Sequence, residues 1–265
     1  MTAVQPPDLL ATITAASRRA VAVRQTRTTI DQLQRQTRRQ PDGRAFVEAL
    51  RNSPRPRIIA ECKRRSPSRG ILREAYEPAT HAKSYEAAGA AAISILTEPT
   101  FFDGSLAHLQ DVRAAVSLPL LRKDFIVTPY QLYEAAANGA DGVLLIAGAL
   151  DATALKELLS NARSLGLAAL VEAHSEEETV HAIEAGADVL GINSRNLRTL
   201  AVEPDVFDRL APLMPQHVVK VAESGVGSGD EIRRLEALGY DAFLVGERLI
   251  AQPDPGAALR ELRTS

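Results

Sequence analysis

Four segments of the chain repeat one pattern, and this repeat limits the folds that the chain can adopt. In each segment an amphipathic helical stretch ends at a glycine, and a short apolar run rich in β-branched residues follows. The glycines are Gly89, Gly139, Gly186 and Gly239, which lie 50, 47 and 53 residues apart. Because one strand and its crossover helix need only about half of that distance, we expect a further strand in each interval.

The further strands are predicted at short apolar runs that precede or separate the repeats. These runs are residues 58–63, 119–123, 167–172 and 218–223, each followed by sequence with helical periodicity. Together with the glycine-marked runs they give eight strands, all separated by the helix-length connections that parallel pairing requires. Eight such units in about 205 residues favour an α/β fold, a closed (βα)8 TIM barrel. Periodicity alone does not exclude the alternative fold, a doubly wound parallel sheet.

Residues 1–56 are predicted to form a helical extension in front of a catalytic barrel of residues 57–265. Apolar residues at helical spacing give this extension a face that can dock on the barrel, namely Leu9, Ile13, Ala16, Ala20 and Val23. The first 40 residues also hold seven arginines and only two acidic residues, a balance shared by organellar transit peptides. The helical pattern favours the folded extension, and Pro54 and Pro56 exclude a helix directly before the first barrel strand.

The net charge and the cysteine content narrow the partners and the compartment that we expect. A formal net charge of -2 gives no reason to expect nucleic acid or a membrane surface as partner. No apolar run reaches the roughly 20 residues of a membrane-spanning helix, and no signal-peptide core is visible. The single cysteine, Cys62, excludes an internal disulfide and a multi-thiolate metal site. We therefore expect a cytoplasmic protein and, because the five histidines lack a ligand spacing, no metal site.

Polar and charged side chains stand at the ends of five predicted strands, where a (βα)8 barrel carries its reactive groups. They are Glu61, Lys63, Lys123, Glu172, Asn193, Arg195, Glu223 and Ser224. Strand alternation places Lys123 on the same side as Leu121, and Glu172 on the same side as Leu170, which indicates the barrel interior. A structural ion-pair network is one interpretation. Convergence from five strands on one mouth favours an acid-base site instead.

Two glycine-containing stretches indicate a phosphate site. AESGVGSGD follows the seventh predicted strand, and VGERL follows the eighth at the start of a short predicted helix. Loops in these positions, together with a helix N-terminus, form the common phosphate site of this barrel. The predicted donors are the backbone N–H groups of Gly225, Gly246 and Glu247.

Seven motifs in order make the chain similar to the indole-3-glycerol phosphate synthase family of tryptophan biosynthesis. They are IIAECKRRSPSRG, ISILTEPTFFDGS, LLRKDFIVTPYQLYEA, VEAHSEEE, GINSRNLRTL, VAESGV and FLVGERL, between about residues 58 and 249. The resemblance implies a carboxy-lyase that closes the pyrrole ring of 1-(2-carboxyphenylamino)-1-deoxyribulose 5-phosphate with loss of carbon dioxide and water. It implies no cofactor and no metal. We expect a small phosphorylated molecule as partner, and a monomer or weak homo-oligomer.

The resemblance also implies roles for individual residues. Lys123 would be the general acid that protonates the ketone oxygen, and Glu172 would be the general base of the later dehydration, with Glu61 assisting. Lys63 would hold the substrate carboxylate, and whether it also gives a proton stays open. Polar substrate groups would be oriented by Asn193, Arg195, Glu223, Ser224 and Ser66, and the aromatic ring would meet Phe102, Phe125, Leu144 and Leu197.

Two alternative functions share parts of this pattern. Another phosphate-binding barrel of the same pathway, such as phosphoribosylanthranilate isomerase or the tryptophan synthase α subunit, would share the late phosphate loops but not ECKRRSPSRG. A non-catalytic phosphate-binding barrel would not need the acid and base residues.

Arg65, Arg69 and Arg248 depart from the family pattern and add charge beside the mouth. Their effect stays open, as does closure of the loop at residues 65–73 over the site.

Overall fold

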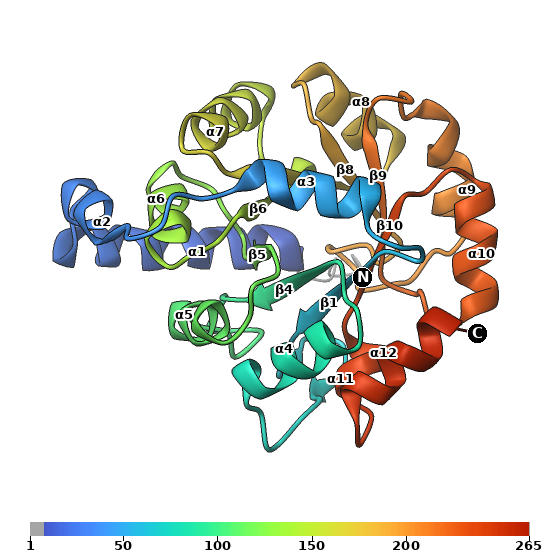
Figure 1. Ribbon diagram of the computed structural model, residues 1–265. Coiled ribbons are helices and arrows are strands. Elements are labelled where there is room, and N and C mark those ends of the chain that lie inside the picture. Colours follow the sequence, from blue (N-terminus) through green and yellow to red (C-terminus); the bar gives the residue numbers. More distant parts are fainter. Residues whose placement is uncertain (1–7, 265) are drawn as a thin grey trace, which may run out of the picture.

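The barrel of this protein is closed and consists of eight parallel strands inside a ring of helices (Figure 1). The computed structural model describes residues 8–264. The strands pair in the order β1-β10-β9-β8-β7-β6-β5-β4, and β4 returns to β1. They are β1 (Ile58–Cys62), β4 (Ala92–Leu96), β5 (Leu120–Lys123), β6 (Gly142–Ile146), β7 (Ala168–Ala173), β8 (Val189–Asn193), β9 (Val219–Glu223) and β10 (Ala242–Val245). The predicted (βα)8 barrel is confirmed, and the doubly wound sheet is excluded.

Helices on the outer surface connect successive strands, and the last two helices follow β10. They are α4 (Pro78–Ala87), α5 (Leu106–Ala115), α6 (Tyr130–Ala137), α7 (Ala152–Ser164), α8 (Glu176–Glu184), α9 (Val206–Leu210), α10 (Gly229–Ala237), α11 (Glu247–Ile250) and α12 (Pro255–Thr264), with 3-10 turns η1 (Ala147–Ala149) and η2 (Ala211–Leu213). Gly89, Gly139, Gly186 and Gly239 follow their helices with φ angles of 85, 87, 85 and 93°. Only glycine adopts this left-handed conformation without strain, which explains the repeat. None of the helices between residues 8 and 264 has both the length and the apolar character to cross a membrane.

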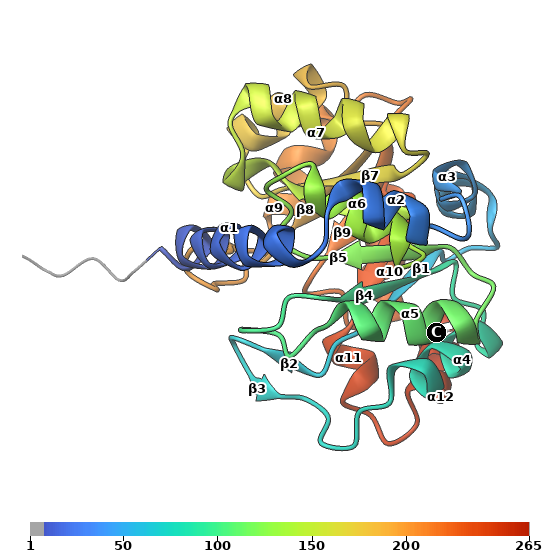
Figure 2. The same cartoon turned by 90° about the vertical axis from the view of Figure 1, so that its left-hand side faces the viewer.

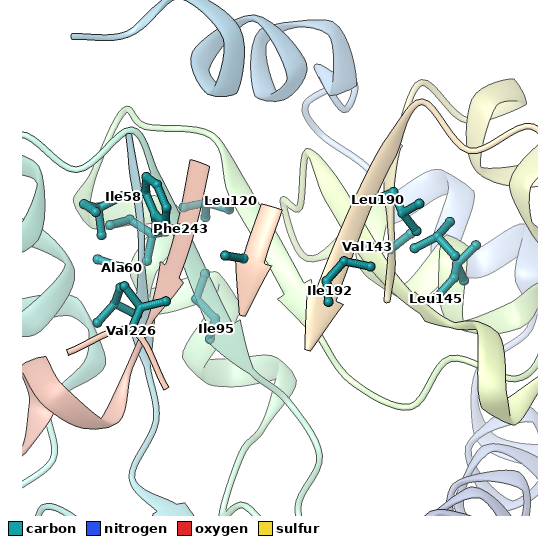
Figure 3. Close-up of a cluster of buried hydrophobic side chains, with 14 of the residues drawn as sticks. Ile58, Ala60, Ile95, Leu120, Val143, Leu145, Leu190, Ile192, Val226 and Phe243 are labelled. Atoms are coloured by element: carbon teal, nitrogen blue, oxygen red, sulfur yellow. The ribbon is translucent and has the colours of Figure 1, made fainter. Parts of the chain in front are cut away.

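Apolar side chains of the strands form two clusters, one on each face of the barrel wall. The outer cluster fills the space between strands and helices and includes Ile58, Ala60, Leu120 and Phe243 (Figure 3). The inner cluster fills the barrel and includes Ile59, Ala92, Leu121, Leu144, Leu170, Val221 and Leu244. Neighbouring residues of one strand thus alternate between the clusters. This alternation confirms that Leu121 and Leu170 face the interior.

The N-terminal extension folds as predicted into helices, α1 (Leu9–Arg27), α2 (Ile30–Gln36) and α3 (Gly43–Asn52). α1 and the small hairpin of β2 (Arg65–Ser66) and β3 (Gly70–Ile71) lie at one end of the barrel, and α3 lies at the other (Figure 2). α3 inserts Phe46 and Leu50 into the inner cluster, while α1 contributes Leu10 and Ile13. The two helices therefore close opposite ends of the interior. The boundary at residue 57 stays a prediction.

The predicted apolar face of α1 is partly wrong. The buried residues are Leu10, Ile13 and Val21, whereas the side chain of Val23 is 52% exposed. The docked face continues through Ser17 and Arg24, which bond to groups of the barrel. The predicted stripe is therefore right at Ile13 and at the partly buried Leu9 and wrong at Val23, because polar residues continue the docked face.

Asp141 joins the extension to the barrel through a fully buried carboxylate. Its Oδ1 accepts hydrogen bonds from the Arg39 guanidinium at 2.5 Å and from the backbone N–H of Asp42 at 3.0 Å. Its Oδ2 accepts from the backbone N–H of Leu120 at 3.0 Å and from Arg113 at 3.2 Å. Two arginines and two backbone donors would lose their acceptor if this carboxylate were removed.

Asp141→Ala is expected to lower the free energy of unfolding by about 3–5 kcal/mol, the usual cost of breaking a buried ion pair. Urea denaturation measures this loss. Asp205→Ala is the control, because Asp205 pairs with Arg209 on an exposed surface of α9 and such pairs contribute about 0–1 kcal/mol. Equal stabilities of the two variants would contradict a structural role for Asp141.

Candidate active site

A cavity of about 520 Å³ opens where the barrel strands end. The structure brings all of the predicted site residues to its wall: Glu61, Lys63, Ser66, Phe102, Lys123, Phe125, Leu144, Glu172, Asn193, Arg195, Leu197, Glu223, Ser224, Gly225, Gly246 and Glu247. They come from β1, β5, β6, β7, β8 and β9 and from the loops and the helix that follow strands. Topology thus gathers residues far apart in the sequence, while their roles stay predictions.

Lys123 stands between two carboxylates at the end of β5. Its Nζ lies 3.0 Å from Glu172 Oε2 and 3.5 Å from Glu223 Oε2. Burial lowers the pKa of Lys123, but the charges of the neighbouring carboxylates outweigh burial and raise this pKa above its usual range. Lys123 is therefore an ammonium group at neutral pH. A charged lysine directed into the cavity can donate a proton or hold an anion.

Asn193 and Lys123 hold Glu172 from two sides. The side-chain amide of Asn193 donates to Glu172 Oε1 at 2.9 Å, and Lys123 Nζ meets the other oxygen. The oxygen of the same amide accepts from the backbone N–H of Arg195 at 2.9 Å, which fixes the orientation of the amide. Glu172 is only 2% exposed. Its carboxylate is thus aimed before any ligand arrives.

Glu61 and Lys63 at the end of β1 pair with each other, Lys63 Nζ to Glu61 Oε1 at 2.7 Å. Burial raises the pKa of Glu61, but the charges of Lys63 and Lys123 outweigh burial and lower it. Glu61 is therefore a carboxylate at neutral pH. The Lys63 side chain is 16% exposed and borders the cavity. It can therefore replace its ion pair with Glu61 by an ion pair with an anionic ligand.

Glu223 is buried, and its surroundings favour the neutral carboxylic acid. Burial raises its pKa well above the ordinary range, the charge of Glu172 raises it further, and the charge of Lys123 opposes both. A protonated Glu223 has an O–H that can donate to a ligand. Glu172 keeps the shorter contact to Lys123 Nζ, 3.0 Å against 3.5 Å for Glu223.

An apolar wall lies beside these charges. The rings of Phe102 and Phe125 are 6.1 Å apart, centroid to centroid, and Leu144 and Leu197 belong to the same inner cluster. Helix α1 adds Leu10 and Ile13 to that cluster. The wall and the charged groups together suit a flat aromatic ligand that carries a carboxylate.

The predicted phosphate donors line the cavity from the loop after β9 and from the start of α11. Gly246 precedes α11, whose first residue is Glu247, and Gly225 follows β9 with a φ of 70°. A Cβ on Gly246 would lie 2.5 Å from Glu61 Oε1, so only glycine lets the chain pass this close to that carboxylate. The backbone N–H groups at the start of α11 provide the electropositive end of a helix turn.

Two of the arginines that depart from the family pattern are ion-paired. Arg69 Nε lies 2.6 Å from Glu247 Oε1, and Arg195 lies 3.8 Å from the other oxygen of that carboxylate. Arg248 faces Glu261 on α12 at 3.6 Å. Arg69 therefore borders the cavity, although its side chain is 69% exposed.

Sequence reasoning missed several groups around the cavity. Ser94 on β4 lies directly across from Glu61 in the barrel register, and its place between two isoleucines in ISIL is the signal that could have identified it. Arg122 and Asp124 flank Lys123 and bond to each other, and Arg122 also bonds to the backbone of α6. Asp124 lines the cavity as well. In the sequence the two residues resemble solvent-exposed charges. In the part of the chain from residue 8 to residue 264, no cluster of three or more His, Cys, Asp or Glu side chains could hold a metal ion.

Comparison with known proteins gives one family and one fold. The model of a family described as indole-3-glycerol phosphate synthase matches residues 10–262. An indole-3-glycerol phosphate synthase of Parafrankia sp. is 50% identical over 245 residues, 92% of this chain and 91% of the relative. That of Saccharopolyspora erythraea is 49% identical over 258 residues, 97% and 96% of the two chains. The solved 3-hexulose-6-phosphate synthase of Salmonella typhimurium has a TM-score of 0.64 at 14% identity, over 78% of this chain and 96% of that one, and so shares the fold.

Proposed function

The chain belongs to the indole-3-glycerol phosphate synthase family and is a decarboxylating carbon-carbon lyase, and we propose that the cavity at the barrel mouth is its active site. The family closes the pyrrole ring of 1-(2-carboxyphenylamino)-1-deoxyribulose 5-phosphate and releases carbon dioxide and water. The observation that carries the proposal is the position of Lys123, in contact with the carboxylate of Glu172 and beside an apolar wall.

In the ring-closing step, the ring carbon that bears the carboxylate attacks the ketone carbon of the substrate. Lys123 donates a proton to the ketone oxygen as negative charge develops there. Its raised pKa keeps the ammonium form available, and the alkoxide that forms has a much higher proton affinity than the ketone. Lys63 holds the substrate carboxylate in place of Glu61, whose Oε1 lies 2.7 Å from Lys63 Nζ.

Loss of carbon dioxide and then of water completes the pyrrole ring. Carbon dioxide leaves from the ring carbon, and the bonding electrons return to the aromatic ring. Phe125 and Phe102 favour this step, because a neutral product tolerates an apolar wall better than a carboxylate does. The hydroxyl leaves as water by taking a proton from an ammonium group of the cavity, Lys63 or a re-protonated Lys123. Glu172 accepts the proton that the neighbouring ring carbon loses, with Asn193 holding the carboxylate in its orientation and Glu61 assisting. Protonated Glu223, with Ser224 and Ser66, orients the hydroxyl groups of the substrate.

The phosphate group is held by backbone N–H groups of Gly225, Gly246 and Glu247 in this proposal. Arg69 and Arg195, paired with Glu247, supply the positive charge that lets a dianion approach a carboxylate. We further propose that the enzyme is cytoplasmic, acts as a monomer or weak homo-oligomer, and needs no cofactor, nucleic acid or membrane. The bound partner is then the phosphorylated substrate alone.

Purified protein mixed with the carboxyphenylamino substrate is expected to develop indole fluorescence. The signal should saturate with substrate concentration and persist in the presence of a metal chelator. Binding of the substrate without any indole signal would refute catalysis and would favour the non-catalytic phosphate-binding barrel instead.

Phe125→Asn is expected to lower kcat about tenfold, because a polar side chain removes the apolar surroundings of the departing carboxylate. Phe125→Leu is the matched control, since leucine keeps the wall apolar and should retain most of the turnover. Release of carbon dioxide in a single turnover measures the step directly. Unchanged release in Phe125→Asn would show that the apolar wall does not promote decarboxylation.

A further inference from the structure

Four charged side chains form a continuous, largely buried chain from helix α1 to strand β5, and the Arg24 side chain at its α1 end is 33% exposed. Arg24 on α1 contacts both oxygens of Glu134 on α6, at 2.6 and 2.9 Å. Arg122 on β5 lies 3.4 Å from Glu134 Oε2 and 2.8 Å from Asp124 Oδ2. Arg122, Asp124 and Glu134 are buried. Two cations and two anions balance, so the chain is electrically neutral although it is withdrawn from water.

Arg122 and Asp124 lie on either side of Lys123 in the sequence, and both are fixed. Arg122 donates to Thr97 Oγ1 at 3.1 Å and to the backbone oxygen of Gln131 at 2.6 Å. Asp124 accepts from the Thr97 hydroxyl at 2.6 Å and from the backbone N–H of Phe125 at 2.8 Å. The side chains before and after Lys123 are thus tied to each other, to Thr97 and to α6, while Lys123 faces Glu172 in the cavity. Bonds on both sides leave the lysine backbone little freedom.

Helix α1 reaches the same segment at a second point. Ser17 Oγ donates to the backbone oxygen of Phe125 at 2.8 Å, and Gln131 Nε2 donates to the same oxygen at 3.0 Å. Phe125 is part of the apolar wall of the cavity. α1 therefore contacts the segment at residues 122–125 through Ser17 directly and through Arg24 by way of Glu134.

We propose that this chain is a positioning device, in which docking of α1 through Arg24 and Ser17 sets the alignment of Lys123 and Phe125. Arg122 and Asp124 are its positioning residues, and the inference rests on the proposed role of Lys123 as the general acid. Buried ion pairs give little net stability but fix geometry. Geometry matters here, because a shift of about 1 Å in a reacting group can cost about 10²-fold in rate.

The competing role for α1 is purely that of a cover. Leu10 and Ile13 close the end of the interior, and a helix that only encloses the substrate would change KM when it is loosened. A helix that aligns Lys123 would instead change kcat with little change in KM. Steady-state kinetics therefore separate the two roles.

Ser17→Ala is the mildest test, because it removes one hydroxyl from α1 and leaves the apolar contacts. We expect kcat to fall about fivefold and KM to stay within about twofold, since one lost hydrogen bond is a modest displacement. Thr14→Ala is the matched control on the same helix: Thr14 Oγ1 is buried and has no hydrogen-bond partner among residues 8–264. Wild-type kcat in Ser17→Ala, or an equal loss in both variants, would overturn the proposal.

Arg24→Met tests the ionic path, and we expect kcat to fall about tenfold; Arg24→Lys should recover only part of it because lysine lacks the bidentate fork. The exposed Arg19→Met on the same helix should keep wild-type values. Hydrogen exchange of residues 120–128 gives a readout that needs no turnover, and it should speed up in Arg24→Met but not in Arg19→Met. If the wild type is inactive, hydrogen exchange alone tests whether α1 is coupled to the segment at residues 122–125. Unchanged exchange and kcat in Arg24→Met would refute it.

Discussion

Lys123→Met is expected to abolish turnover and to leave substrate binding largely in place. A positioned general acid contributes about 10² to 10⁴-fold in rate, and methionine preserves the length of the side chain without a proton to give. The variant also removes the cation between Glu172 and Glu223, 3.0 and 3.5 Å from Lys123 Nζ. Indole fluorescence measures the turnover, and calorimetric titration with the substrate measures binding.

Lys63→Met separates the two lysines of the cavity. Lys63 is proposed to hold the substrate carboxylate, so its loss should raise KM more than it lowers kcat. Lys220→Met serves as the control, because Lys220 on β9 is directed away from the interior, with its Nζ 3.5 Å from the backbone oxygen of Ala211. Retained kcat in Lys123→Met together with lost kcat in Lys63→Met would assign the proton transfer to Lys63.

The raised pKa of Lys123 has a consequence for the pH profile of the wild type. An upward shift from the ordinary value of 10.5 keeps the ammonium form through the whole neutral and weakly alkaline range. A fall of kcat/KM between neutral pH and that value must then come from another group. On the acid side, protonation of a carboxylate base should remove activity.

The upward shift of the Lys123 pKa also affects stability. It stabilises the fold at pH below the unfolded pKa of this lysine, and this contribution is lost as pH rises through the folded pKa.

Local sequence patterns predicted the barrel because its elements follow local rules. Gly89 and its three counterparts mark helix ends through a backbone conformation that depends on the residue itself. Strand alternation placed Lys123 beside Leu121 on the interior, and the parallel topology then brought the strand ends to one mouth. Strand order therefore determines which side chains line the cavity.

The missed features depend on contacts between distant segments. Ser17 and Arg24 look like surface residues of α1 until Glu134 and the Phe125 backbone are placed against them. The raised pKa of Glu223 arises from burial and from the nearby charge of Glu172 on another strand. The local sequence around Glu223 does not indicate that Glu172 lies close to it. The same holds for Arg69, whose partner Glu247 lies at the far end of the sequence.

Glu172→Gln is expected to lower formation of indole product by about 10² to 10⁴-fold, the usual contribution of a general base. Glutamine keeps the shape of the side chain but cannot accept the proton that is lost during dehydration. Lys123 remains, and its pKa should fall because Glu172 is the nearest of the carboxylates that raise it. The acid that assists ring closure is therefore present and somewhat stronger in this variant.

This difference allows the two catalytic groups to be assigned to separate steps. In a single turnover, Glu172→Gln should release carbon dioxide from a labelled carboxylate without a matching indole signal, because the block lies after decarboxylation. Lys123→Met should release neither, because ring closure precedes both. Glu177→Gln, on the exposed surface of α8, should release both at the wild-type rate. If Glu172→Gln lost carbon dioxide release and indole formation in equal proportion, Glu172 would have to act at or before decarboxylation, and the proposed order of proton transfers would be wrong.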